Sequence, residues 1–480
     1  MRVAMFAPEV HPYAKTGGLA DVLAALPPAL TRVGVEVSVC LPAYRSALRA
    51  LGPLPVGQRV HAPVSSRIEP AEVLRVPDAP IPTFLVRADR FFDRDGLYGA
   101  DGQDYGDNAE RFAFFCRAAL EWLRHVSPAP DILHLHDWQT ALIPAFLRAT
   151  GDHYPELAAT RTVLTVHNLT YQGRFPSSAW HLLNLDPRHF IPDGLEFYGD
   201  ISYLKAGLLY ADAITTVSPR YAEEIQTPSF GAGLDGVLRL RADRLRGILN
   251  GVDDAVWNPA TDPLIPARYD RESLIGKRRC RAALQSELGL TVGPEPTLLA
   301  VVSRLAEQKG LDLLAAVLPE LLETRAVQFV ALGSGEPPYE EILVALAERF
   351  PGQVGVRIGF DEALAHRIEA GADVFLMPSR FEPCGLNQLY SLRYGTVPVV
   401  HATGGLDDTV VEFDPGTGLG TGFKFTPFTP EALLAALRRA LATRSEPQAW
   451  QRLVTNGMTQ DFSWDRAARE YARLYASVAA

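Results

Sequence analysis

Short, continuously apolar stretches alternate along the chain with longer stretches in which apolar residues recur at helical spacing. Apolar residues fill most of the run 2–10, recur every three or four positions over 19–34, and fill the next run, 35–44. Continuous apolar runs are typical of parallel strands covered on both faces, and the longer spacing predicts an amphipathic helix. The N-terminal segment therefore predicts a β-α-β unit.

The same alternation continues in the first half of the chain and begins again in the second half. In the first half we expect further strands at 131–137, 160–168 and 212–219, with a helix at 138–150. In the second half we expect strands at 297–305, 327–335, 354–360, 373–379 and 397–403, and helices at 310–324, 339–350, 361–372 and from 404. Strands that alternate with helices predict parallel sheets. The fold class is therefore α/β, with two doubly wound, Rossmann-like domains.

Chain length and local composition suggest where these domains begin and end. A chain of 480 residues is too long for one ordinary core. We expect an N-terminal domain at 1–247, with an antiparallel excursion at about 52–84 where prolines and short alternating stretches gather, and a second domain at 248–460. The remaining residues, 461–480, contain an amphipathic helix, and the first domain is a candidate for its packing partner.

Charge and cysteine content exclude several classes of function. The net charge of −10 disfavours binding to nucleic acid or to an anionic membrane. No apolar run is long enough to span a membrane, and the N-terminus lacks a cleavage-site pattern. The four cysteines are far apart and form no C-x-x-C pair, so neither a zinc knuckle nor a disulfide framework is expected. These features predict a cytoplasmic protein with reduced thiols.

A lysine and two glycines precede the first expected helix, in the order Lys15, Thr16, Gly17, Gly18. A helix start presents unsatisfied N–H groups, and glycines let an anion approach them closely. The spacing differs from that of a P-loop. The motif therefore indicates a phosphate site of another kind, with a solvated turn as the alternative.

The second half carries a comparable set of groups. Arg304 follows an expected strand, and Lys309 precedes the next helix. Thr403, Gly404 and Gly405 stand at another helix start. Taken together, these residues suggest a cradle for a diphosphate, although Arg304 and Lys309 alone could be ordinary surface residues flanking a loop.

A loop that follows another expected strand contains a carboxylate, Glu382, with Arg380 close by in sequence. The carboxylate could accept hydrogen bonds from sugar hydroxyls, or it could pair with Arg380. Cys384 in the same loop has no general base beside it in sequence, so a buried filler is the plainer interpretation.

Polar residues also follow two strands of the first half. His167 and Asn168 come directly after one strand, and Asp137 directly after another. His134 and His136 have the alternation of a metal-binding pair, but no matched ligands accompany them, so no metal site is expected.

Seven motifs in one order carry a resemblance to a known family. They resemble the motifs of bacterial glycogen synthases and plant starch synthases, from about residue 3 to the C-terminus: KTGGLADV, HDWQT, TVHNLTYQG, NGVDDAVWNP, VSRLAEQKGLD, PSRFEPCGLNQLYSLRYGTVPVV and TGGLDDTV. The resemblance implies a GT-B fold, in which two Rossmann-like domains face each other across a cleft. It implies retaining transfer of glucose from ADP-glucose to the non-reducing end of an α-1,4-glucan such as glycogen, without a cofactor or a metal.

The resemblance also implies roles for individual residues. The catalytic set that it implies is Lys15, Asp137, His167, Arg304, Lys309 and Glu382. The implied substrate-binding set is Gly17, Gly18, Asp21, Asn168, Asn250, Phe360, Cys384, Gly385, Leu386, Thr403, Gly404 and Gly405. Within these sets Lys15, Arg304 and Lys309 are expected near the donor phosphates, and Glu382 beside the glucose.

The chain departs from the family pattern at two positions. Phe360 stands near the expected adenine site where tyrosine is common, and Asn387 stands where threonine is expected. Both changes bear on nucleotide preference. A glucan phosphorylase with pyridoxal phosphate on a lysine, and a binding module without activity, remain the alternative functions.

Overall fold

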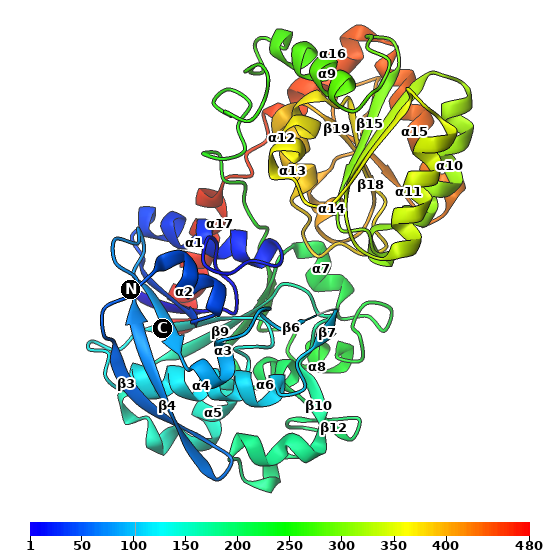
Figure 1. Cartoon of the computed structure of the whole chain (residues 1–480). Coiled ribbons are helices and arrows are strands. Elements are labelled where there is room, and N and C mark those ends of the chain that lie inside the picture. Colours follow the sequence, from blue (N-terminus) through cyan, green and yellow to red (C-terminus); the bar gives the residue numbers. More distant parts are fainter. Residues whose placement is uncertain (101) are drawn as a thin grey trace. The chain divides into compact units, whose positions relative to one another are not determined.

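The chain folds into two compact units. The computed structural model describes residues 1–100 and 102–480. Unit 1 comprises Met1–Gly251 together with Trp464–Ala480, and unit 2 comprises Val252–Ser463 (Figure 1). Each unit contains its own mainly or fully parallel sheet, flanked by helices. Among the described residues, no helix has both the length and the apolarity needed to cross a membrane.

Unit 1 is built on a nine-stranded sheet in the order β14-β13-β9-β8-β1-β2-β5-β4-β3. Its strands are β1 (Arg2–Phe6), β2 (Glu36–Pro42), β3 (Gln58–Val64), β4 (Arg67–Arg75), β5 (Thr83–Arg87), β8 (Ile132–His136), β9 (Arg161–Val166), β13 (Ala213–Thr216) and β14 (Leu245–Gly247). All neighbours pair in parallel except β3 with β4 and β4 with β5, which are antiparallel. Two small sheets add β6 (Gly99–Ala100), β7 (Gln103–Asp104), β10 (Arg174–Pro176), β11 (Glu196–Phe197) and β12 (Asp200–Ser202).

Helices cover both faces of this sheet. They are α1 (Gly18–Arg32), α2 (Arg45–Leu51), α3 (Asp89–Phe92), α4 (Asn108–Leu123), α5 (Leu142–Thr150), α6 (Tyr203–Tyr210), α7 (Pro219–Glu224), α8 (Asp235–Leu240) and α17 (Trp464–Ala479), with short 3₁₀ turns between residues 151 and 189. The C-terminal helix α17 packs beside α1 (Figure 1). Arg32 of α1 donates to Asp465 from both Nε and Nη2, and Tyr475 of α17 reaches His134 of the sheet.

Unit 2 is built on a fully parallel sheet in the order β17-β16-β15-β18-β19-β20. Its strands are β15 (Thr297–Val302), β16 (Val327–Gly333), β17 (Val354–Ile358), β18 (Val374–Met377), β19 (Val397–His401) and β20 (Phe423–Phe425). Its helices are α9 (Ile275–Glu287), α10 (Leu311–Glu323), α11 (Pro337–Arg349), α12 (Glu362–Gly371), α13 (Asn387–Tyr394), α14 (Gly404–Thr409), α15 (Pro430–Arg444) and α16 (Pro447–Met458), with a 3₁₀ turn η5 (Glu307–Lys309).

The buried strands explain the continuous apolar runs of the sequence. In β15, Leu299 and Val301 join one hydrophobic cluster, and Leu298 and Ala300 join the cluster on the opposite face. A strand covered on both faces buries every side chain, so its sequence shows no alternation. The predicted α/β fold with two Rossmann-like domains is confirmed.

Both sheets have the strand order of doubly wound folds. Counted in chain order, the strands of unit 2 lie in the order 3-2-1-4-5-6. In unit 1 the order reverses in the same way between β1 and β8. Ligands of such sheets bind beyond the carboxyl ends of the strands, at this point of reversal.

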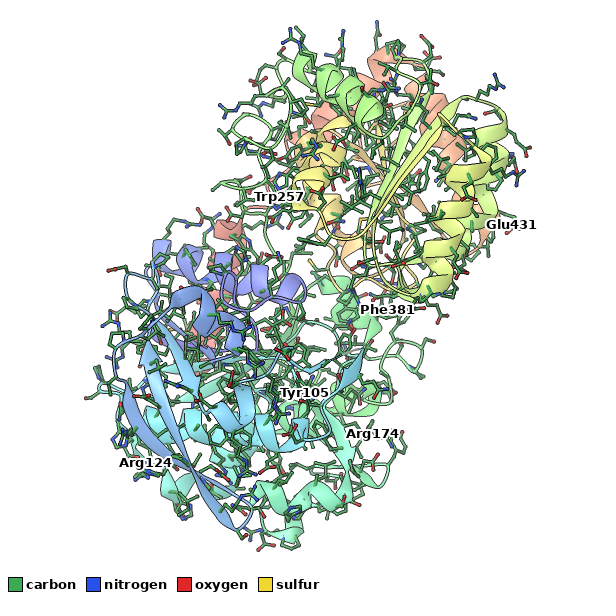
Figure 2. The ribbon with its side chains drawn as sticks, viewed as in Figure 1. Tyr105, Arg124, Arg174, Trp257, Phe381 and Glu431 are labelled. Atoms are coloured by element: carbon green, nitrogen blue, oxygen red, sulfur yellow. The ribbon has the colours of Figure 1, made fainter. Side chains whose placement is uncertain are left out.

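The segment that enters unit 2 is anchored by an aromatic stack. The Trp257 ring, labelled in Figure 2, lies between those of His366 and Tyr390, with ring centroids 3.8 and 3.9 Å away. His366 Nδ1 is 2.7 Å from Asp262 Oδ2, and Tyr394 donates to the same oxygen. This stack and the buried carboxylate fix the segment on α12 and α13.

Candidate active site

In unit 1, the loop between β1 and α1 is held by a carboxylate of the chain itself. Glu9 is 4% exposed and accepts hydrogen bonds from Thr16 N at 2.5 Å, Thr16 Oγ1 at 2.6 Å and Gly17 N at 3.2 Å. Tyr98 also donates to Glu9, at 2.7 Å. The backbone donor of Gly17, expected to face a phosphate, therefore binds Glu9 in this structure. Sequence reasoning missed Glu9, although an acidic residue closely following the first strand was visible.

Lys15 and Asp21 form a pair at the start of α1. Lys15 Nζ donates to Asp21 Oδ1 at 2.7 Å, and about a third of each side chain is exposed. Gly18 is the first residue of α1. The lysine thus stands where the helix dipole is positive, and its charge is balanced by a carboxylate on the first turn.

Asp137 and His167 follow the adjacent strands β8 and β9. Asp137 has a φ of 58°, a left-handed conformation that is uncommon outside glycine and asparagine or aspartate. Its Oδ1 accepts from His167 N at 2.7 Å. Burial raises the pKa of Asp137 to about 7, and the nearby Glu9 adds to the rise, whereas backbone N–H groups of His167 and Asn168 oppose it. A carboxyl group in this environment can exchange a proton near neutral pH.

Two further histidine side chains, those of His134 and His136, lie near His167. His136 Nδ1 lies 3.0 Å from His167 Nε2, and the ring of His134 packs against that of His136 at a tilt of 39°, with centroids 4.2 Å apart. Burial lowers the pKa of His134 and of His167 to about 3, and that of His136 well below its usual range. The three imidazoles are therefore neutral at physiological pH.

Asn250 lies at the end of unit 1. Its side chain is 7% exposed, and its Oδ1 is buried without a hydrogen-bond partner in residues 1–100 and 102–480. A buried amide oxygen without a partner is unusual and often marks a binding position. Asn168 directly follows His167 in the chain, and its Oδ1 accepts from Thr170 N at 3.0 Å.

In unit 2, Lys309 and Glu382 form an ion pair beyond the carboxyl ends of the strands. Lys309 Nζ lies 2.6 Å from Glu382 Oε2, and Ser379 Oγ donates to the same oxygen at 2.9 Å. Glu382 is 7% exposed. A buried carboxylate needs such partners to remain charged. Both residues follow strands of the sheet, β15 and β18, that are neighbours at the point of reversal.

Arg380 and Arg304 differ in their partners. Arg380 binds Asp312 of α10 at 2.7 Å, so Glu382 pairs with Lys309 and the alternative pairing with Arg380 is wrong. Arg304 is exposed, and within the described chain its guanidinium forms no ion pair; it donates only to Gln308 Oε1, at 3.3 Å. Of the two predicted cations, one is thus paired and the other is available.

The start of α14 packs directly on the Glu382 loop. Gly404 has a φ of 45°, and a Cβ there would lie 2.1 Å from Glu382 O. A Cβ at Gly405 would lie 2.1 Å from Cys384 O. Only glycine allows this approach, so the two glycines bring the helix start and Thr403 against the carboxylate loop.

Cys384, Gly385 and Leu386 form the turn between Glu382 and α13. Cys384 is 4% exposed, and Gly385 has a φ of 70°. Asn387, the first residue of α13, donates from Nδ2 to Val302 O at 2.6 Å, which ties the turn to the end of β15.

Phe360 lies apart from this turn, after β17. Its side chain is 83% exposed. The following residue, Asp361, caps α12 by accepting from Leu364 N at 2.8 Å. The ring therefore stands on a well-anchored helix start and presents a flat apolar face to solvent.

Comparisons with known proteins agree over the whole chain. Residues 2–240 match the family model described as starch synthase catalytic domain, and residues 290–456 match the model described as glycosyl transferases group 1. The glycogen synthase of Anaeromyxobacter dehalogenans is 53% identical over 100% of this chain and 99% of its own. The chain belongs to the glycogen synthase family.

Other members of the glycogen synthase family extend this result. The glycogen synthase of Syntrophotalea carbinolica is 48% identical over 99% of this chain and 98% of its own. The solved catalytic domain of starch synthase IV from Arabidopsis thaliana, bound to ADP and acarbose, matches with a TM-score of 0.90 and 33% identity over 100% of this chain and 99% of its own. A sucrose-phosphate synthase from Thermosynechococcus elongatus, at 18% identity and a TM-score of 0.62, shares the fold. The predicted family and the GT-B class are confirmed, and the chain is a glycosyltransferase.

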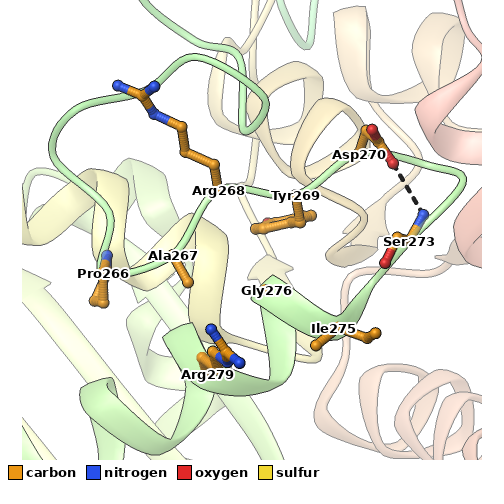
Figure 3. Close-up of a pocket in the computed structure, with 9 residues that line it drawn as sticks. All are labelled: Pro266, Ala267, Arg268, Tyr269, Asp270, Ser273, Ile275, Gly276 and Arg279. Atoms are coloured by element: carbon orange, nitrogen blue, oxygen red, sulfur yellow. Dashed lines mark hydrogen bonds between the residues drawn. The ribbon is translucent and has the colours of Figure 1, made fainter.

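Two surface hollows of this glycogen synthase family member lie away from the predicted residues. One, in unit 2, has a volume of about 480 Å³ and is lined by Pro266–Asp270 and by residues around the start of α9 (Figure 3). Asp270 accepts from Ser273 N at its rim, at 2.9 Å. The other, of about 540 Å³, lies beside Arg45 and Asp93 in unit 1. None of the predicted site residues lines either hollow.

No cluster of three or more histidine, cysteine or acidic side chains with a metal-binding arrangement occurs in the part of the chain that the structure describes. The rings of His134 and His136, the pair weighed as metal ligands, pack against each other at a tilt of 39°. Both ring nitrogens of His134 lie within hydrogen-bond distance of hydroxyl groups of Thr165 and Tyr475.

Proposed function

We propose that the chain transfers glucose from ADP-glucose to the non-reducing end of an α-1,4-glucan, with retention at the anomeric carbon and release of ADP. The proposal rests on the Lys309–Glu382 pair at the carboxyl edge of the unit 2 sheet and on the exposed Arg304, which follows the same strand as Lys309, β15. The full-length similarity to a starch synthase bound to ADP and acarbose supports it.

Unit 2 holds the donor in this proposal. Arg304 and Lys309 neutralise the diphosphate, and the start of α14 with Thr403–Gly405 adds backbone donors. Breaking the glycosyl–phosphate bond places negative charge on the departing phosphate, and preorganised cations stabilise it. The Glu382 carboxylate, oriented by Lys309 and Ser379, accepts hydrogen bonds from the glucose hydroxyls.

Unit 1 supplies the acceptor side. Asp137, His167, Asn168 and Asn250 offer neutral or nearly neutral hydrogen-bonding groups that suit sugar hydroxyls. Lys15, paired with Asp21 on the first turn of α1, offers a cation to a phosphate group.

Retention has two possible routes. A carboxylate nucleophile would give a covalent glycosyl-enzyme, as in retaining glycosidases. We propose instead that the acceptor hydroxyl attacks from the side of the leaving phosphate, which takes the proton. A glycosyl-enzyme trapped with donor alone and detected by mass spectrometry would overturn this route.

The test is the release of ADP when purified protein is mixed with ADP-glucose and glycogen, with UDP-glucose in parallel. We expect ADP-glucose to be preferred, and both Lys15→Ala and Glu382→Ala to lose most turnover while circular dichroism stays unchanged. Near-normal rates in both variants would refute the site. Phosphorolysis of glycogen with visible-edge absorbance from a pyridoxal group would favour the phosphorylase alternative. No disulfide occurs among the described residues, and we propose a cytoplasmic location on this ground.

A further inference from the structure

The contact between His136 and His167 restricts how the second ring is protonated. His136 is the last residue of β8 and is fully buried. Its Nδ1 lies 3.0 Å from Nε2 of His167, which follows the neighbouring strand β9. Two ring nitrogens at this distance share one hydrogen, so one ring donates and the other accepts.

Both rings are neutral, so each carries a single N–H. Burial lowers the pKa of His167 to about 3 and that of His136 well below the usual value for histidine. Two arrangements remain. Either His136 donates from Nδ1, and the proton of His167 is on its Nδ1, or His167 donates from Nε2, and the proton of His136 is on its Nε2.

The surroundings of His136 Nε2 separate the two arrangements. This atom is buried and has no hydrogen-bond partner in residues 1–100 and 102–480. The nearest ring, that of His134, packs at a tilt against His136 and directs its own nitrogens to Thr165 and Tyr475. An N–H at this position would be a buried donor without an acceptor, whereas a lone pair would be only an unused acceptor. Buried donors without partners are the rarer case.

We propose that His136 is a positioning residue that donates from Nδ1 to His167 Nε2 and holds His167 with its proton on Nδ1. His167 then offers its substrate side an N–H donor and no free lone pair. It binds a hydroxyl oxygen of the sugar, and it does not act as the general base that removes the acceptor proton. The identity of the bound hydroxyl rests on the proposed function. The protonation state of His167 is independent of that function.

The backbone around His167 is fixed independently of His136. His167 N donates to Asp137 Oδ1 at 2.7 Å, so loss of the His136 ring leaves the main chain anchored. Tyr475 offers a matched control, because it is equally buried and its hydroxyl binds His134, the ring packed against His136, at 2.7 Å. Tyr475→Phe removes one hydrogen bond from His134 without touching the His136–His167 contact.

The decisive measurement is the tautomer of His167 in the full-length, ligand-free protein. Protein deuterated and labelled with ¹³C and ¹⁵N in histidine gives the shifts of both ring nitrogens by long-range correlation NMR, and His167→Gln assigns the signal among the eleven histidines. We expect a protonated Nδ1 and a bare Nε2 from pH 6 to pH 8. A protonated Nε2, the form that free histidine prefers, or a titration in this range would overturn the proposal.

Variants then test the role of His136. In His136→Leu we expect the His167 shifts to move toward protonated Nε2, with kcat lower by roughly tenfold to a hundredfold, as for other groups that orient a functional histidine. Tyr475→Phe should leave the His167 shifts unchanged. Unchanged shifts in a folded His136→Leu protein would overturn the proposal, and if that variant does not fold, the wild-type spectrum decides. A protein that shows the expected tautomer but releases no ADP would refute the proposed function alone.

Discussion

The two units present opposite electrostatic environments at the same edge of similar sheets. In unit 1, the residues after β8 and β9 are partly buried and largely uncharged: desolvation raises the pKa of Asp137 to about 7 and lowers that of His167 to about 3. In unit 2, Glu382 lies 2.6 Å from the Lys309 ammonium, and Arg304 is exposed without an ion pair in the described chain.

The presence or absence of an oppositely charged partner explains this electrostatic difference. Strand order does not explain it, since both sheets contain the same reversal of strand order. A buried group without an opposite charge shifts toward its neutral form, and a buried pair can keep its charges. Neutral donors and acceptors suit sugar hydroxyls, whereas fixed cations suit phosphates. The same architecture can thus present two kinds of site.

The largest expected effect is on the charged pair of unit 2. Lys309→Met keeps the length of the side chain, but it leaves Glu382 without its cation and the donor phosphates with one cation fewer. We expect kcat for ADP release to fall by about 10³-fold, the scale of losing a preorganised charge partner. The measurement is steady-state turnover with ADP-glucose and glycogen.

Arg438→Met is the control for that variant. Arg438 also binds a carboxylate in unit 2, Glu320 at 2.7 Å, but both side chains are more than half exposed. Exposed pairs contribute little, so this variant should keep normal kcat. Equal losses in the two variants would remove the distinction between a paired site charge and an ordinary surface charge.

Removing the available cation should have the next largest effect. Arg304→Ala is expected to lower kcat/KM for the donor by about 10²-fold, because the diphosphate loses a charge-assisted donor. Stability should change little, since Arg304 is exposed and donates only to Gln308 among the described residues. Arg278→Ala, at an exposed position of α9, is the control. A kcat/KM within threefold of wild type would show that Arg304 does not meet the phosphates.

The neutral site of unit 1 should be visible in the pH dependence of stability. The pKa of Asp137 is about 7 in the folded protein, above its ordinary value of 3.8. The folded state therefore holds this proton where the unfolded state releases it, so the contribution is present below about pH 4 and is lost as pH rises through 7. Relative to Asp137→Asn, the wild-type melting temperature should fall by at least ~2 °C between pH 5 and pH 8.

Glu369→Gln in unit 2 shows whether burial alone produces this behaviour. Glu369 is buried and its pKa is raised to about 8, although Ser391 donates to it and Lys277 is near. We expect the stability of the wild type relative to Glu369→Gln to fall as pH rises, as for Asp137, and this fall to extend to higher pH. A wild-type protein that becomes more stable than Asp137→Asn as pH rises would contradict the neutral character assigned to the unit 1 site.

The sequence predicted the sheets better than the contacts at their edges. Continuous apolar runs located β8, β9, β15 and β18, because each buries both faces. The predicted ends of strands were less accurate. The run 2–10 suggested one strand, but in the structure β1 ends at Phe6 and spans Arg2–Phe6. The residues that follow β1 belong to the loop that contains Glu9.

The partners at the site could not be read from local pattern. Lys309 and Glu382 are 73 residues apart in sequence, and only the strand order of the sheet brings them together. The same limit hid Glu9 as the partner of Gly17 and left Arg380, which binds Asp312, as a candidate for Glu382. A motif shows that polar groups follow neighbouring strands, but their pairing depends on side-chain reach.

The smallest effect is expected at Phe360, because its proposed contact with the adenine is apolar and involves no charge. Its ring is 83% exposed, so Phe360→Ala should leave the melting temperature unchanged within about 1 °C. Stacking of a base on an aromatic ring contributes about 1–3 kcal/mol, and at an exposed position we expect the lower end, a rise of roughly fivefold in KM for ADP-glucose. Phe360→Tyr keeps the ring and should stay within twofold of wild type. An unchanged KM in Phe360→Ala would place the adenine elsewhere and leave unit 2 to hold the donor through its charges alone.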